Sequence, residues 1–204
     1  MGNAPAHITL VTGASRGLGA EVAAQLAAAD THVVVHYREN YAHAHTVAAA
    51  IRDAGGHAST VSADISDEAA TTAMIESIGA RFGRLDTLIL NASGDRDTQR
   101  RLALLAMPLM SAGGRIVFVT NHQAHFFPNK AVAKGCAPLA ASKRAAETAL
   151  YALRFEFARA GIQYTLVSGS TADEKFAAAI ANAATTTSPT GVVYVGSADY
   201  LMTA

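Results

Sequence analysis

The sequence predicts an α/β fold, in which a doubly wound parallel sheet of about seven strands carries helices on both faces. Short runs rich in β-branched residues recur between alanine-rich stretches, which is the pattern of successive βαβ units. Most of these runs lack alternating polar residues, so both faces of the sheet should be buried. The 204 residues fit one domain, residues 1–204, and half of them are apolar, which is enough to bury a sizeable core.

Strands and helices are expected to alternate along the whole chain. The expected strands are the apolar runs at residues 8–11, 32–36, 58–62, 87–90, 115–119, 164–167 and 192–195. Helices are expected to begin near Leu18, Tyr41, Asp67, Asp97, Pro138 and Ala172. Glycines suited to left-handed backbone mark where helices should end, at Gly55, Gly83, Gly113 and Gly161.

Charge and cysteine content exclude several classes of partner. Sixteen basic and sixteen acidic residues give a formal net charge of zero, so we expect no basic surface for nucleic acid. Cys136 is the one cysteine, which rules out an internal disulfide, and no apolar run is long enough to cross a bilayer. His43 and His45 have too few neighbouring ligands for a metal site. We therefore expect a cytoplasmic protein that binds no nucleic acid, membrane or metal.

A glycine-rich segment follows the first expected strand and leads into the first expected helix. From Thr12 it reads T-G-A-S-R-G-L-G, with glycines at Gly13, Gly17 and Gly19. Gly13 permits a tight turn, Gly17 lets the backbone approach a pyrophosphate, and Gly19 lets the helix pack closely on the strand. The helix then directs its free amide groups at the phosphates. This context of strand, loop and helix predicts a dinucleotide site.

The spacing T-G-x-x-x-G-x-G resembles the short-chain dehydrogenase/reductase family, and further matches cover nearly the whole chain. They are Asp64 after the third expected strand, the N-A-S-G turn from Asn91, the S-K pair at Lys143 and the S-G pair at Gly169. The resemblance implies a Rossmann-type fold that binds a nicotinamide dinucleotide. It implies cofactor contacts from Gly13, Ser15, Arg16, Gly17, Leu18, Gly19, Tyr37, Arg38, Asp64, Ile65, Asn91, Ala92, Lys143 and Gly169.

The end of the second expected strand indicates which dinucleotide binds. NAD-specific members of the family carry an acidic residue there, whereas this chain has Tyr37 followed by Arg38. Arg38 and Arg16 offer planar sets of donors to a 2′-phosphate, so NADP (NADPH) is expected in preference to NAD. In the alternative, Arg38 pairs with Glu39 or with solvent. Asp64 resembles the aspartate that contacts adenine, and it also suits the N-cap of a helix.

The residues expected at the reactive centre depart from the family. The resemblance implies a proton-donating tyrosine, a lysine four residues later and a serine after the fifth strand. Lys143 matches the lysine, but Leu139 occupies the tyrosine position, and Thr120 or Asn121 stands where the serine is expected. Cys136 lies seven residues before Lys143 and is a candidate thiol donor. In the alternative it is an inert cysteine in a loop or in the core.

Two histidines follow the fifth expected strand, at the edge of the sheet where ligands bind. His122 and His125 suit general acids near neutral pH. We expect them instead to cap a helix or to face solvent.

Two connections are shorter than is usual in the family. They lie near residues 94–97 and 170–172, where the family normally has segments that line and cover the substrate pocket. The pocket is either truncated and open, or loops of a longer natural chain are missing from this sequence. We favour missing loops, because both gaps fall at sites that are typically mobile.

Three functions are consistent with this pattern. The first is an oxidoreductase that transfers a hydride between NADPH and a carbonyl or alcohol substrate, with Lys143 orienting the ribose. The second is a catalytically impaired NADP(H)-binding protein with a sensing or structural role, which Leu139 favours. The third is an interaction module that uses the expected helix 138–160. The equivalent helix packs against a partner subunit in the family, which implies a homodimer or homotetramer.

Overall fold

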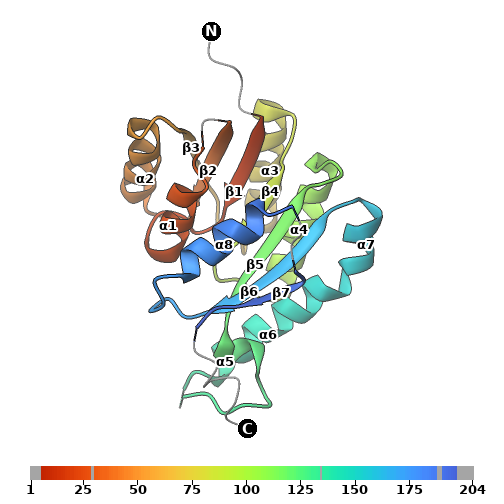
Figure 1. Ribbon diagram of the computed structural model, residues 1–204. Helices are drawn as coiled ribbons and strands as arrows, with labels where there is room; N and C mark the ends of the chain where they lie inside the picture. Colours follow the sequence, from red (N-terminus) through yellow and green to blue (C-terminus); the bar gives the residue numbers. More distant parts are fainter. Residues whose placement is uncertain (1–5, 29, 134, 188–189, 197–204) are drawn as a thin grey trace.

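The computed structural model describes residues 6–28, 30–133, 135–187 and 190–196. Its strands form one sheet in the order β3-β2-β1-β4-β5-β6-β7, and each neighbouring pair is parallel (Figure 1). The expected doubly wound α/β class is therefore confirmed. The strands are β1 (His7–Val11), β2 (Thr31–Tyr37), β3 (His57–Ser62), β4 (Thr87–Leu90), β5 (Arg115–Asn121), β6 (Gln163–Gly169) and β7 (Val192–Tyr194).

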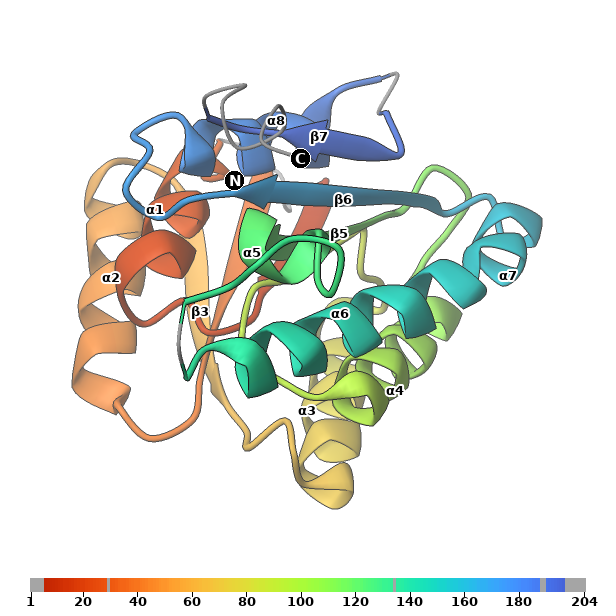
Figure 2. The same cartoon turned by 90° about the horizontal axis from the view of Figure 1, so that it is seen from below.

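Helices cover both faces of the sheet (Figures 1 and 2). One face packs against α1 (Gly17–Gln25), α2 (Tyr41–Asp53) and α8 (Phe176–Thr185). The other packs against α3 (Glu68–Phe82), α4 (Arg96–Ala106), the 3₁₀ turn η1 (Met107–Leu109), α6 (Ala137–Ala152) and α7 (Arg154–Arg159), while α5 (His122–His125) follows β5. Two buried apolar clusters thus sandwich the sheet. Within the described ranges, no helix is both long and apolar enough to span a membrane.

The centre of the sheet is the pair β1 and β4. Leu10 of β1 lies opposite Val34 of β2 on one side and opposite Leu88 of β4 on the other, and all three side chains are buried. β2 and β3 extend the sheet on the β1 side, and β5, β6 and β7 extend it on the β4 side, so the strand order reverses between β1 and β4. Open parallel sheets bind ligands beyond the carboxyl ends of the strands at such a reversal. The fold therefore points to a ligand site beyond Val11 and Leu90.

The long helix expected over residues 138–160 is two helices. α6 and α7 are separated at Leu153, where the backbone (φ −80°, ψ 1°) leaves helical geometry. Leu150, Leu153 and Phe157 are all buried in the core. Ordinary core packing therefore explains these apolar residues at helical spacing.

Two further helices differ from the expected boundaries. The helix expected from Asp97, with Gly113 marking its end, ends earlier, at Ala106, and gives way to η1. η1 contains Pro108, which has no amide hydrogen to donate within an α-helix. α8 begins at Phe176 and not near Ala172. A turn comes first, because the carboxylate of Asp173 accepts a hydrogen bond from the Lys175 amide at 2.9 Å.

Candidate functional site

A large cavity lies at the carboxyl ends of the central strands. Its volume is about 1560 Å³, and its walls come from the connections that follow β1 to β6 together with one residue of α6. Every residue expected to contact the cofactor lines this cavity, from Gly13 in the phosphate loop to Lys143 and Gly169. The fold therefore brings together the whole sequence-predicted set, although its members come from strands that are distant in the chain.

The glycine-rich loop forms an open cradle at the start of α1. Gly13 and Gly17 have positive φ angles, 65° and 54°. A Cβ atom at Gly17 would meet nothing within 4 Å, whereas one at Gly19 would lie 2.3 Å from the carbonyl oxygen of Gly13. The N-cap residue of α1, Arg16, makes no side-chain capping bond, so the first amides of the helix stay free for a ligand. An open cradle with free amides fits a pyrophosphate.

Thr12 and Asn91 hold the loop from the β4 side. The Thr12 hydroxyl donates to the carbonyl of Ile89 at 3.0 Å and accepts from the amides of Asn91 and Ala92, at 2.9 and 3.0 Å. The Asn91 side-chain amide donates to the Thr12 carbonyl at 3.0 Å. These bonds couple the phosphate loop to the N-A-S-G turn through neutral groups.

The end of β3 carries Asp64 in a tight turn. Its carboxylate accepts from the hydroxyl and the amide of Ser66, at 2.7 and 2.9 Å, and these bonds lower the pKa of Asp64. The N-cap of α3 is Asp67, whose carboxylate accepts from the Ala70 amide at 2.9 Å. The alternative that Asp64 caps the helix is therefore wrong, because the helix begins three residues later than that role requires.

Arg38 stands at the end of β2 beside the cavity. Its guanidinium lies 3.0 Å from the Glu39 carboxylate, and the two side chains are 62% and 78% exposed. The structure therefore shows the pairing of Arg38 with Glu39 that the alternative predicts. An exposed pair of this kind contributes at most about 1 kcal/mol, so a bound phosphate can displace it.

The walls near β5 hold the candidate reactive groups. Thr120 is 1% exposed, and its hydroxyl oxygen has no hydrogen-bond partner among the described residues. Lys143 reaches the cavity from α6, and burial lowers the pKa of its ammonium. Asn121 also lines the cavity, but its side chain accepts from the Ala124 amide at 2.8 Å and so caps α5. An orphaned buried hydroxyl and an ammonium that line the same cavity fit the binding of a polar substrate or cofactor group.

Cys136 and Leu139 lie outside the cavity. Cys136 occupies the N-cap position of α6, one residue before the helix begins. Leu139 is 55% exposed, and neither residue is among those that line the cavity. The position of the family tyrosine therefore supplies no group to this site.

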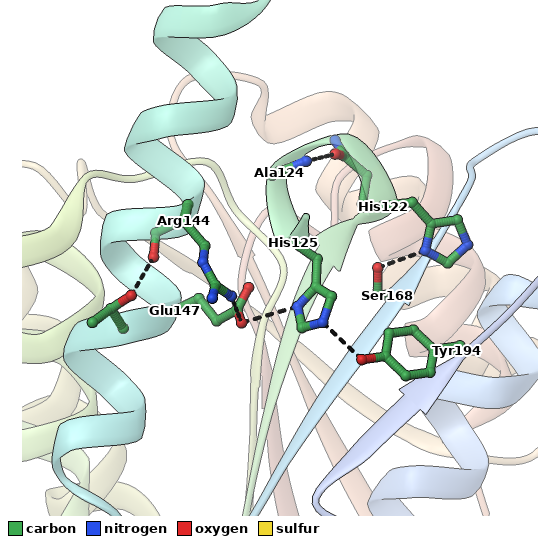
Figure 3. A network of polar contacts seen from close by, with 9 residues as sticks. His122, Ala124, His125, Arg144, Glu147, Ser168 and Tyr194 are labelled. Atoms are coloured by element: carbon green, nitrogen blue, oxygen red, sulfur yellow. Dashed lines mark hydrogen bonds and ion pairs between the residues drawn. The ribbon is translucent and has the colours of Figure 1, made fainter. Parts of the chain in front are cut away.

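A polar network joins α5, α6 and β7 beside the cavity (Figure 3). His125 contacts the Tyr194 hydroxyl through Nε2 at 2.8 Å and the Glu147 carboxylate through Nδ1 at 2.9 Å. Arg144 pairs with the same carboxylate. His122, which lines the cavity, lies 2.8 Å from the Ser168 hydroxyl through Nδ1.

This network corrects the expectation for the two histidines. His122 and His125 neither cap a helix nor face solvent, because Asn121 caps α5 and both rings have polar partners. The side chains of His125 and Glu147 are only 12% and 9% exposed. The partners come from α6, β6 and β7, so local sequence contains no signal for them.

The two short connections form the rim of the cavity. Asp95 follows β4 and caps α4, since its carboxylate accepts from the Thr98 amide at 2.8 Å. Ser170 and Thr171 follow β6 and also line the cavity. The first connection joins β4 to α4, and the second joins β6 to α8 through the turn at Asp173. The expectation that loops are missing here stays a prediction, which the intact mass of the natural protein tests.

His36 is a cavity residue that is absent from the sequence-predicted set. It is 2% exposed, and its ring contacts both the phosphate loop and the segment after β3. The signal that it leaves in the sequence is a histidine inside an otherwise apolar strand. Such a residue must find hydrogen-bond partners when buried.

The fold and this site define a dinucleotide-binding α/β protein. A family model for short chain dehydrogenases matches residues 7–104. The 1-cyclohexenylcarbonyl-CoA reductase of Streptomyces collinus is 32% identical over 188 residues, which cover 82% of this chain and 65% of that protein. The chain belongs to the short-chain dehydrogenase/reductase family. It spans between 34% and 65% of the lengths of the first curated relatives that it matches.

Solved structures show the same relationship. The promiscuous reductase LugOII, which catalyses keto-reduction at C1 during lugdunomycin biosynthesis, matches with a TM-score of 0.83 and 25% identity, over 98% of this chain and 100% of that one. A short chain dehydrogenase from Burkholderia cenocepacia J2315, in complex with NADP, matches with a TM-score of 0.71 and 29% identity, over 81% of this chain and 74% of that one.

Proposed function

We propose that this chain is an NADP(H)-dependent oxidoreductase that transfers a hydride between the cofactor and a small carbonyl or alcohol substrate. The observation that carries the proposal is the cavity that unites the phosphate loop, Arg38, Thr120 and Lys143. The cavity combines groups suited to phosphates with a buried hydroxyl and an ammonium suited to a substrate oxygen. The relatives that are named as reductases support the same chemistry.

The residues of the chain divide the work between binding and proton transfer. The cofactor, when bound, supplies a hydride from its nicotinamide ring. The free amides of α1 and the two arginines, Arg16 and Arg38, bind its phosphates. The Thr120 hydroxyl donates a hydrogen bond to the substrate oxygen, and Lys143 holds the ribose. Because Leu139 supplies no acid, we assign the proton that reaches the substrate oxygen to Nζ of Lys143, which solvent then reprotonates.

NADP is the proposed cofactor in preference to NAD. β2 ends at Tyr37 and Arg38 follows it, so the position where NAD-specific members carry a carboxylate has none. The next residue, Glu39, also lines the cavity, but its carboxylate pairs with Arg38. Arg16 lines the same cavity and adds a second guanidinium. The neighbour from Burkholderia cenocepacia that binds NADP supports this preference.

Fluorescence titration of NADPH and NADH, followed by turnover against a panel of carbonyl compounds, tests the proposal. Wild type is expected to bind NADPH more tightly, and Arg38→Ala to weaken NADPH about tenfold with no change for NADH, because one charge-assisted bond is lost. Arg96→Ala is the matched control, since Arg96 is equally exposed beside Asp97 and does not line the cavity.

The outcomes separate the parts of the proposal. A wild type that binds neither dinucleotide would overturn the whole of it. Binding without turnover of any carbonyl would overturn the enzymatic activity. Tighter binding of NADH, unchanged in Arg38→Ala, would overturn only the cofactor preference.

We also propose that two or four copies associate through the face formed by α6 and α7. Tyr151 and Phe155 are 57% and 65% exposed, and the Arg154 guanidinium stacks on both rings, at 4.5 and 4.2 Å from their centroids. Exposed aromatic and arginine side chains are typical of protein interfaces.

The cytoplasmic location of the protein stays a prediction.

Phe155→Glu is expected to convert the assembly into monomers, because it places a charge at an apolar contact. Light scattering measures the mass. The control is His43→Glu, which adds the same charge at an exposed position of α2 and should leave the mass unchanged. A monomeric wild type would contradict the proposed assembly.

A further inference from the structure

His36 joins two parts of the candidate cofactor site. Its Nδ1 atom lies 2.9 Å from the amide nitrogen of Gly13, the first glycine of the phosphate loop. Its Nε2 atom lies 3.0 Å from the carbonyl oxygen of Ala63, which precedes Asp64 at the end of β3. The backbone of His36 also accepts a bond from Ala14 at 2.8 Å. One buried ring thus joins the phosphate loop to the segment that follows β3.

These two partners determine the protonation state of the ring. The Gly13 amide can only donate, so Nδ1 must be an unprotonated acceptor. The Ala63 carbonyl can only accept, so Nε2 must carry the hydrogen. Both nitrogens are satisfied only in neutral histidine. A proton on Nδ1 would face the Gly13 N–H, and the bond to the phosphate loop would be lost.

We propose that neutral His36 is a positioning residue that holds the phosphate loop in its dinucleotide-binding form, so that protonation of His36 releases the loop and weakens cofactor binding. The inference rests on the proposed function, because it assumes that the cavity binds a dinucleotide. His36, a titratable group, holds the loop from the β2 side. Thr12 and Asn91 hold it from the β4 side through groups that do not titrate.

The surroundings of His36 favour the neutral ring. Burial lowers its pKa from the usual 6.5, while the hydrogen bond to Ala63 and the charge of Asp64 oppose this shift. Three more charged groups line the cavity near these elements: Arg16 in the phosphate loop, and Arg38 and Glu39 after β2, which pair with each other. Since the pKa in the closed loop is lowered, the binding form is complete above the usual value and is lost as the pH falls through the lowered one.

Calorimetric titration of NADP⁺ at pH 8, 6.5 and 5 tests the inference, with His36→Asn as the main variant. An asparagine oxygen can accept from the Gly13 amide in place of Nδ1 and does not titrate. The 2′-phosphate of the ligand titrates near pH 6 in every variant, so the informative quantity is the difference between proteins. From pH 8 to pH 5, wild type is expected to lose about tenfold more affinity than His36→Asn.

Two further variants sharpen the comparison. His36→Gln places its amide near Nε2, loses the acceptor for Gly13, and should bind weakly at all three pH values. His32→Asn removes another buried histidine of β2, one that contacts Ser59 at 2.8 Å, and should keep the pH dependence of wild type. Equal pH dependence in wild type and His36→Asn would overturn the inference while leaving the proposed function intact.

A measurement on wild type alone keeps the inference testable if the variants fail to fold. Nitrogen NMR of the ligand-free protein at pH 8 should show neutral His36 with its hydrogen on Nε2. A hydrogen on Nδ1 would overturn the inference. Absence of NADP⁺ binding by wild type at pH 8 would instead overturn the proposed function, and the inference with it.

Discussion

Lys143→Met is expected to lower the turnover number at least about 100-fold, because it removes the group assigned to proton delivery. Lys143 lines the cavity and is half-buried, and Leu139, at the position of the family tyrosine, lies outside it. Methionine keeps most of the length and apolar surface of the side chain. The dissociation constant for NADPH should therefore rise no more than about tenfold, the effect of losing one charge-assisted bond.

The pH dependence of wild type gives the same proposal a second test. Burial lowers the pKa of Lys143 from 10.5, and the proton donor is the charged form. The rate of carbonyl reduction should therefore be high below the lowered pKa and should fall as the pH rises through it. Lys143→Met should not show this fall in rate. Lys175→Met, on a lysine that does not line the cavity, is the control. Unchanged turnover in Lys143→Met would contradict the assigned role.

Gly19→Ala is expected to raise the dissociation constant for NADPH at least about 100-fold, because it deforms the phosphate loop. The new Cβ would lie 2.3 Å from the carbonyl oxygen of Gly13 and 2.6 Å from the side-chain nitrogen of Asn91. The first of these atoms is backbone, so the loop itself must move. Overpacking of this kind also costs about 1–3 kcal/mol in stability.

Fluorescence titration and thermal unfolding together measure this effect. Gly191→Ala is the matched control, because a Cβ at Gly191 meets nothing within 4 Å and the residue is exposed. It should bind NADPH as wild type does and unfold at the same temperature. Affinity within about threefold of wild type in Gly19→Ala would show that the loop is not the phosphate site, since a change that small is less than 1 kcal/mol.

Most of the fold could be predicted because its signals are local. The β-branched runs place the strands, and the glycine spacing from Gly13 to Gly19 places the first loop and helix. The resemblance carried by this spacing and by the later motifs implies a set of cofactor contacts, and these residues do line the cavity. Their contacts with a dinucleotide stay predictions. The sequence does not distinguish two aspartates that both suit a helix N-cap, Asp64 and Asp67. In the structure Asp67 caps α3, whereas the Asp64 carboxylate accepts from Ser66.

The remaining features depend on strand order, which brings distant residues together. His36 meets Gly13 and Ala63 only because β2 lies between β1 and β3. Likewise, β7 brings Tyr194 to His125 across a separation of 69 residues, and α6 places the Glu147 carboxylate on the other side of that ring. A sequence pattern reports the conformation of neighbouring residues, whereas the partner of a buried polar group is whichever donor or acceptor the packed elements leave within reach. The class of fold and the phosphate loop therefore follow from the chain alone, and the partners of its buried histidines follow only from the packed sheet.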